Sequence, residues 1–175
     1  STDRTRYWEI VPSPYLERAL WLESDRMGYL LAAMTQERLD NQKSVVQNER
    51  RQNYDNRPYG TVWEKMVTVM YPPNHPYSWL TIGSMKDIGA ATLDDVSLFF
   101  NTWYTPNNAT LAIVGDIDVE QAKELVTKYF GAIPPGPAVA AVGRWQPSMT
   151  DDVVLEMADR VQLPRTWMSW PTVPI

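Results

Sequence analysis

The feature that most constrains the fold is a helix-like stretch over residues 36–53. At about 100° per residue, a partly apolar set of positions falls on one face of this helix. That face is formed by Leu39, Gln42, Val45, Val46 and Glu49. We expect it to point inward, and Glu49 then needs a partner, because an unpaired buried carboxylate is costly. An arginine or a metal ion would serve, while a partly exposed Glu49 in a surface ion pair is the simpler interpretation of the helix alone.

Composition sets outer limits on the class of protein. The chain has 175 residues, of which 44% are hydrophobic and 21% charged, so it is globular rather than disordered. Its net charge of -5 argues against a dedicated nucleic-acid binder. With no cysteine, disulfides, thiolate zinc sites and cysteine nucleophiles are excluded. A single histidine cannot build a His-rich metal site, and no apolar run approaches the roughly 20 residues of a membrane span.

The rest of the pattern predicts helices and strands in one chain. We predict helices over residues 15–34, 36–54, 59–70, 92–103 and 119–130, and Thr92 followed by Asp94 and Asp95 indicates an N-terminal cap for the helix over 92–103. We predict strands over residues 5–11, 109–114, 152–157 and 160–171. Residues 78–91 read as an irregular stretch. This order favours an α+β fold with helices packed on one face of a mainly antiparallel sheet.

Proline and glycine divide the chain into parts. They are dense over residues 133–147, which indicates a linker. We therefore expect one unit over residues 1–134, the linker over 135–150, and the first strands of another unit over 151–175. The chain starts without an initiator methionine and ends within an apolar run, so we expect it to be a piece of a longer protein.

Most candidate sites have simple structural interpretations. Gly115 follows a predicted strand and opens a helix, but a single glycine cannot form a dinucleotide site. His75 lies between prolines, where loop packing explains it better than a Ser-His-Asp site does. The acidic pairs at 94–95 and 151–152 stand at element starts, where helix-dipole or surface roles suffice. Glu49 is the remaining candidate.

Several segments, in order along the chain, match one family pattern. They are DRTRYWE at residues 3–9, ALWLESDRM at 19–27, VVQNERR at 45–51, DNRPYG at 55–60, YTPNNATL through VGDI at 104–117, and FGAIP at 130–134. Together they resemble the pitrilysin/insulinase family of zinc metallopeptidases. In that family an H-x-x-E-H helix supplies two histidine ligands and a general-base glutamate. A glutamate on a downstream helix is the third zinc ligand, and Glu49 matches its position.

The resemblance implies a zinc-dependent metalloendopeptidase that hydrolyses peptides or unfolded proteins through a zinc-activated water. Glu49 would be a metal ligand of Zn2+, and no catalytic residue lies within the chain. The H-x-x-E-H motif is absent and should lie upstream of Ser1, so the resemblance implies that residues 1–134 are the later part of the first, zinc-bearing domain and that the domain over 151–175 is truncated. We therefore expect the chain alone to be inactive and to bind zinc weakly. Many members also carry a glutamate where Gln42 stands, and glutamine can donate or accept a hydrogen bond but cannot supply a negative charge beside the metal.

A second interpretation is a non-catalytic homologue that serves as a structural or partner subunit, since the family contains such paralogues. An unrelated binding domain would require the ordered matches to be chance. The resemblance implies as partners a peptide substrate and the missing parts of the chain or a homologous subunit. It also favours the bacterial periplasm or cell envelope.

Overall fold

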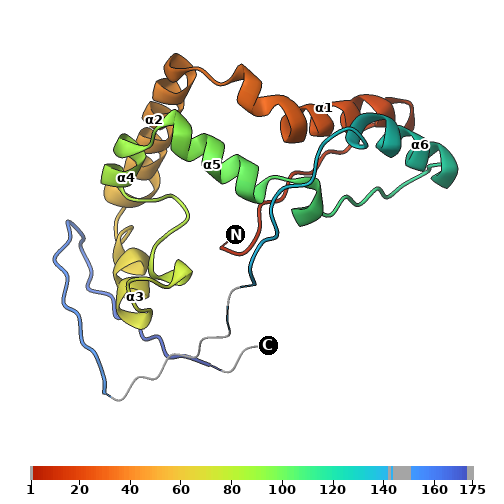
Figure 1. The fold of residues 1–175 in the computed structure, drawn as a ribbon. Coiled ribbons are helices and arrows are strands. Elements are labelled where there is room, and N and C mark those ends of the chain that lie inside the picture. Colours follow the sequence, from red (N-terminus) through yellow and green to blue (C-terminus); the bar gives the residue numbers. More distant parts are fainter. Residues whose placement is uncertain (1, 142, 144–150, 173–175) are drawn as a thin grey trace. The chain divides into compact units, whose positions relative to one another are not determined.

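The computed structural model describes residues 2–141, 143 and 151–172 (Figure 1). Its α-helices are α1 (Leu16–Tyr29), α2 (Gln36–Arg50), α3 (Val62–Met70), α4 (Met85–Ala90), α5 (Leu93–Trp103) and α6 (Val119–Phe130). Short 3₁₀ turns are η1 (Ser13–Tyr15), η2 (Leu30–Ala33), η4 (Pro76–Ser78) and η5 (Pro106–Asn108), and η3 (Arg51–Asp55) is a π-helical turn. None of these helices is both long and apolar enough to cross a lipid bilayer.

The expected sheet is not formed in the part of the chain that the structure describes. The four predicted strands, residues 5–11, 109–114, 152–157 and 160–171, carry no strand or bridge. The α+β prediction is therefore wrong, and the described residues form an α-helical structure. The reason is physical: β-propensity favours an extended backbone, but a strand forms only when a neighbouring strand completes the hydrogen-bond ladder.

Two compact units make up the chain. One, called here unit 1, comprises residues 1–4, 40–90 and 142–175; the other, unit 2, comprises residues 5–39 and 91–141. The sequence-based boundaries at 134 and 150 stay a prediction. Residues 142 and 144–150 of the predicted linker lie outside the described residues.

In unit 2 the helix α1 packs against α6. Leu20 on α1 and Ala122 on α6 are both buried. Near the surface, the Lys128 ammonium and the Tyr129 hydroxyl each donate to the same carboxylate oxygen of Glu17, both at 2.7 Å. Two helices that are distant in sequence thus pack together, with buried apolar residues on both and hydrogen bonds between them near the surface.

Side-chain caps begin the two later helices of unit 2. The Thr92 hydroxyl accepts from the backbone N–H of Asp95, and the Asp95 carboxylate accepts from the backbone N–H of Thr92, which forms a capping box at α5. The Asp118 carboxylate accepts from the N–H of Gln121 at 2.8 Å and caps α6. The predicted start of α5 at a Thr92 cap is confirmed.

In unit 1 the C-terminal segment contacts Tyr59, which precedes α3. The Tyr59 backbone N–H donates to Asp159 at 2.8 Å, and its hydroxyl donates to the carbonyl of Leu163 at 2.5 Å. The Arg165 guanidinium lies 4.4 Å from the centre of the Tyr59 ring, and the Trp167 ring lies 5.3 Å from it. Residues predicted as strands are therefore held here by side-chain contacts rather than by a sheet.

Candidate functional site

The predicted metal ligand, Glu49, lies in the last turn of α2 and is exposed. Across the described residues, its carboxylate has no hydrogen bond and no ion pair. The two arginines that follow it bind other residues. Arg51 donates to the Asn48 side chain at 2.7 Å, and Arg50 donates to the Glu64 carboxylate. The surface ion pair considered for Glu49 is not formed in this part of the chain.

The buried face of α2 differs from the predicted one. The buried or half-buried residues in this stretch are Leu39, Lys43, Val46, Gln47 and Arg50. Leu39 and Val46 point inward as predicted, but Gln42 and Glu49 are exposed and Val45 is 50% exposed. The charge that α2 carries into the interior therefore belongs to Arg50, which is only 7% exposed, and not to Glu49.

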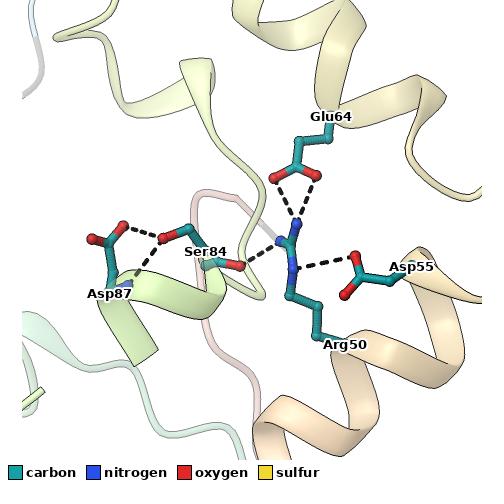
Figure 2. A network of polar contacts seen from close by, with 6 residues as sticks. Arg50, Asp55, Glu64, Ser84 and Asp87 are labelled. Atoms are coloured by element: carbon teal, nitrogen blue, oxygen red, sulfur yellow. Dashed lines mark hydrogen bonds and ion pairs between the residues drawn. The ribbon is translucent and has the colours of Figure 1, made fainter. Parts of the chain in front are cut away.

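Arg50 is the centre of a polar cluster that joins separate segments of unit 1 (Figure 2). One guanidinium nitrogen, Nη2, donates to both carboxylate oxygens of Glu64 on α3, at 3.0 and 2.8 Å. The other, Nη1, donates to the carbonyl of Gly83 at 2.6 Å. Nε lies 3.6 Å from an Asp55 carboxylate oxygen, which is an ion-pair distance and too long for a hydrogen bond.

Electrostatics within the cluster favour the charged pair. The hydrogen bonds to Glu64 raise the pKa of the Arg50 guanidinium above its ordinary value. Burial acts in the opposite direction, and the carboxylates of Glu64 and Asp55 add to the rise. Arg50 is therefore a permanent cation held between two carboxylates and a carbonyl.

Local backbone features place the Gly83 carbonyl. Gly83 has a φ of +76°, in the left-handed region that favours glycine. Its N–H donates to the carbonyl of Leu80 at 3.0 Å, which closes a turn. Next to it, the Ser84 hydroxyl accepts from the N–H of Asp87 at 3.0 Å at the start of α4 (Figure 2). The turn and the helix start together fix the carbonyl that Arg50 binds.

The other candidates have structural roles. The His75 ring accepts from the N–H of Tyr77 at 3.1 Å and stacks on the Tyr71 ring at 5.1 Å, as loop packing predicts. Asp95 belongs to the α5 cap, and Gly115 lies in a bend. Asp151 and Asp152 are exposed in a segment without strand structure.

Among the residues that the structure describes, no three His, Asp or Glu side chains converge as a metal site would require. Glu49 nevertheless fits a single ligand position, because its carboxylate is exposed and bound to nothing else here, and carboxylate oxygen is an established zinc donor. Its helix end is also fixed through Arg50.

Comparisons with known proteins place the chain in a family. The family described as "Peptidase M16 inactive domain" matches residues 90–175. The zinc protease PqqE of Helicobacter pylori is 34% identical over 133 residues, which cover 76% of this chain and 29% of that protein. A crystal structure of a protease from Helicobacter pylori matches with a TM-score of 0.65 and 31% identity, over 75% of this chain and 31% of that chain. The chain belongs to the pitrilysin/insulinase family. The probable zinc protease PqqL of Escherichia coli is 36% identical to this family member over 53 residues. This shorter match covers 30% of this chain and 6% of that protein.

This family member spans less than a third of either Helicobacter pylori relative. The match described as an inactive domain begins at residue 90, so Glu49 and the Arg50 cluster lie before it. The assignment of Glu49 as a metal ligand stays a prediction, and sequence reasoning missed Arg50. The available signal was the alternative face of α2 that passes through Leu39, Lys43, Val46 and Arg50.

Proposed function

We propose that the chain is part of a zinc metalloendopeptidase in which Glu49 is the third protein ligand of the metal. Three findings support this: family membership, relatives named zinc proteases, and an exposed Glu49 carboxylate without a competing partner among the described residues. The last of these carries the assignment to Glu49. The two histidine ligands and the general base would come from an H-x-x-E-H helix outside this chain.

The chemistry divides between the metal and the chain's own residues. Bound zinc supplies a water that ionises near neutral pH and can attack a peptide carbonyl. Glu49 contributes one carboxylate oxygen to hold that metal. The neighbouring arginines do not neutralise this carboxylate, because Arg50 and Arg51 bind Glu64 and Asn48. No arginine of this segment therefore competes with the metal for the Glu49 carboxylate.

The first test is zinc content and peptidase activity of the full-length protein and its Glu49→Gln variant. Glutamine preserves size but removes the charge, so we expect metal affinity to fall by more than about 100-fold and activity with it. Glu37→Gln, at an exposed position near the start of the same helix, is the matched control and should retain both. If Glu49→Gln keeps metal and activity, Glu49 is not the ligand.

The second candidate function is a non-catalytic partner subunit. The description of the matching family over residues 90–175 as an inactive domain favours it. An intact H-x-x-E-H motif upstream would support the enzyme, and loss of either histidine would support the silent subunit. Location in the bacterial periplasm or cell envelope stays a prediction, which cell fractionation tests.

A further inference from the structure

We infer that Arg50 and Glu64 form a positioning pair that sets the direction of the Glu49 carboxylate. This inference rests on the proposed function of Glu49 as a zinc ligand. Residues adjacent in an α-helix project about 100° apart. When Arg50 is fixed toward the interior, the preceding residue is therefore fixed toward the surface, where Glu49 is found.

The end of α2 needs such an anchor. A π-helical turn replaces the regular hydrogen-bond pattern of an α-helix by a wider one, so helix geometry changes where the two meet. After Arg50 the backbone widens into the π-helical turn η3, so the regular ladder of α2 stops one residue beyond Glu49. Without a tertiary contact, the last turn of α2 could rotate or unwind, and the Glu49 carboxylate would move with it.

The contacts of Arg50 fix rotation as well as position. Its bonds run in two directions, to Glu64 on α3 and to Gly83 in the turn before α4 (Figure 2). A planar guanidinium with two separate partners cannot turn about its own axis without losing one of them. Lysine would keep the charge but could not match both partners with the same fork geometry.

The contacts of Arg50 also keep its positive charge away from the negative charge of the adjacent Glu49. Glu64 and Asp55 lie beside Arg50, so the positive charge next to Glu49 is balanced within unit 1. Without the Glu64 carboxylate, the Arg50 guanidinium would be able to form an ion pair with the adjacent exposed carboxylate of Glu49. The pair therefore keeps Glu49 both correctly directed and unpaired.

The experiment measures zinc dissociation from the full-length protein by competition with a chelator, well below the unfolding temperature. The variants are Arg50→Lys and Glu64→Gln, with Arg51→Lys as the matched control, since Arg51 is exposed and bonds locally to Asn48. We expect zinc affinity to fall about 10–100-fold in both test variants, as for residues that orient metal ligands, and to change less than about 2-fold in the control. The Co2+-substituted protein adds a readout, because its absorption spectrum reports ligand geometry and should change in the same two variants.

The outcomes separate this inference from the proposed function. If Glu49→Gln loses zinc but Glu64→Gln binds zinc and Co2+ like the wild type, the pair only stabilises the fold and the positioning role is overturned. If Glu49→Gln itself keeps zinc, the proposed ligand role fails first. Should Arg50→Lys fail to fold, Glu64→Gln decides, because glutamine preserves the shape of the side chain and one acceptor.

Discussion

At the scale of single residues, the Glu23 carboxyl on α1 lies in surroundings that oppose its ionisation. Its side chain is 23% exposed, and one oxygen, Oε1, is buried without a hydrogen-bond partner among the described residues. The other accepts from Arg26 at 2.9 Å. Burial raises the pKa of Glu23, with a further rise from Glu9, and Arg26 offsets only part of this.

The raised pKa of Glu23 has a defined effect on the pH dependence of stability. The folded state binds the Glu23 proton more tightly than the unfolded state, in which the carboxyl has its ordinary pKa near 4.5. The contribution of Glu23 to stability is therefore fully present below that value and is lost as pH rises through the folded-state pKa. We expect Glu23→Gln to lose less stability than the wild type between about pH 4 and about pH 7. Urea denaturation across this range measures the difference, and equal slopes in variant and wild type would contradict it.

The choice between Glu49 and Arg50 shows what a residue pattern can predict. Both residues extend a plausible helical face that begins at Leu39, and the two faces differ by only one position at the end of α2. What decides between them is Glu64 and Gly83, which bind Arg50 from other segments. The helix itself was predictable from local periodicity, whereas its inward charge depended on contacts distant in sequence.

At the scale of elements, the cap at α5 is a feature that the sequence predicts directly. Thr92 and Asp95 satisfy each other's backbone N–H groups, and these bonds lower the pKa of Asp95. We expect Thr92→Ala to lower the free energy of unfolding by about 1 kcal/mol, because the N–H of Asp95 then loses its side-chain acceptor. Urea denaturation tests this, with Asn101→Ala at an exposed position on the same helix as the control. A loss equal to that of the control would show that the cap does not stabilise α5.

Elements that depend on distant partners were harder to predict. Residues 109–114 are apolar and β-rich, yet they form no ladder in the described part of the chain, and Val114 is 94% exposed.

The helix α4 was missed because residues 78–91 contain two glycines and little periodicity. It begins instead at the hydrogen bond between Ser84 and Asp87, a local cap that a composition-based reading overlooks.

At the scale of the whole molecule, each unit has a small apolar interior. Within residues 2–141, 143 and 151–172, only four hydrophobic side chains are buried, namely Leu20, Leu39, Val67 and Ala122. Ordinary domains of this size bury far more apolar surface, which is their main source of stability. The ordered family matches predicted the family correctly, but composition alone could not show how few apolar side chains this chain buries.

The unburied apolar surface predicts self-association of the 175-residue chain when it is expressed alone. Extended segments expose Trp8 at 73%, Val114 at 94% and Val154 at 82%, and their backbones form no sheet. Unpaired extended segments with apolar side chains favour pairing between copies. Sedimentation velocity should show a mass that rises with concentration, and Val114→Lys combined with Val154→Lys should shift it toward the monomer, because charge opposes edge pairing. The control Asn101→Lys adds charge at an exposed helical site and should leave association unchanged. A wild-type chain that stays monomeric at about 100 µM would show that these segments do not drive association.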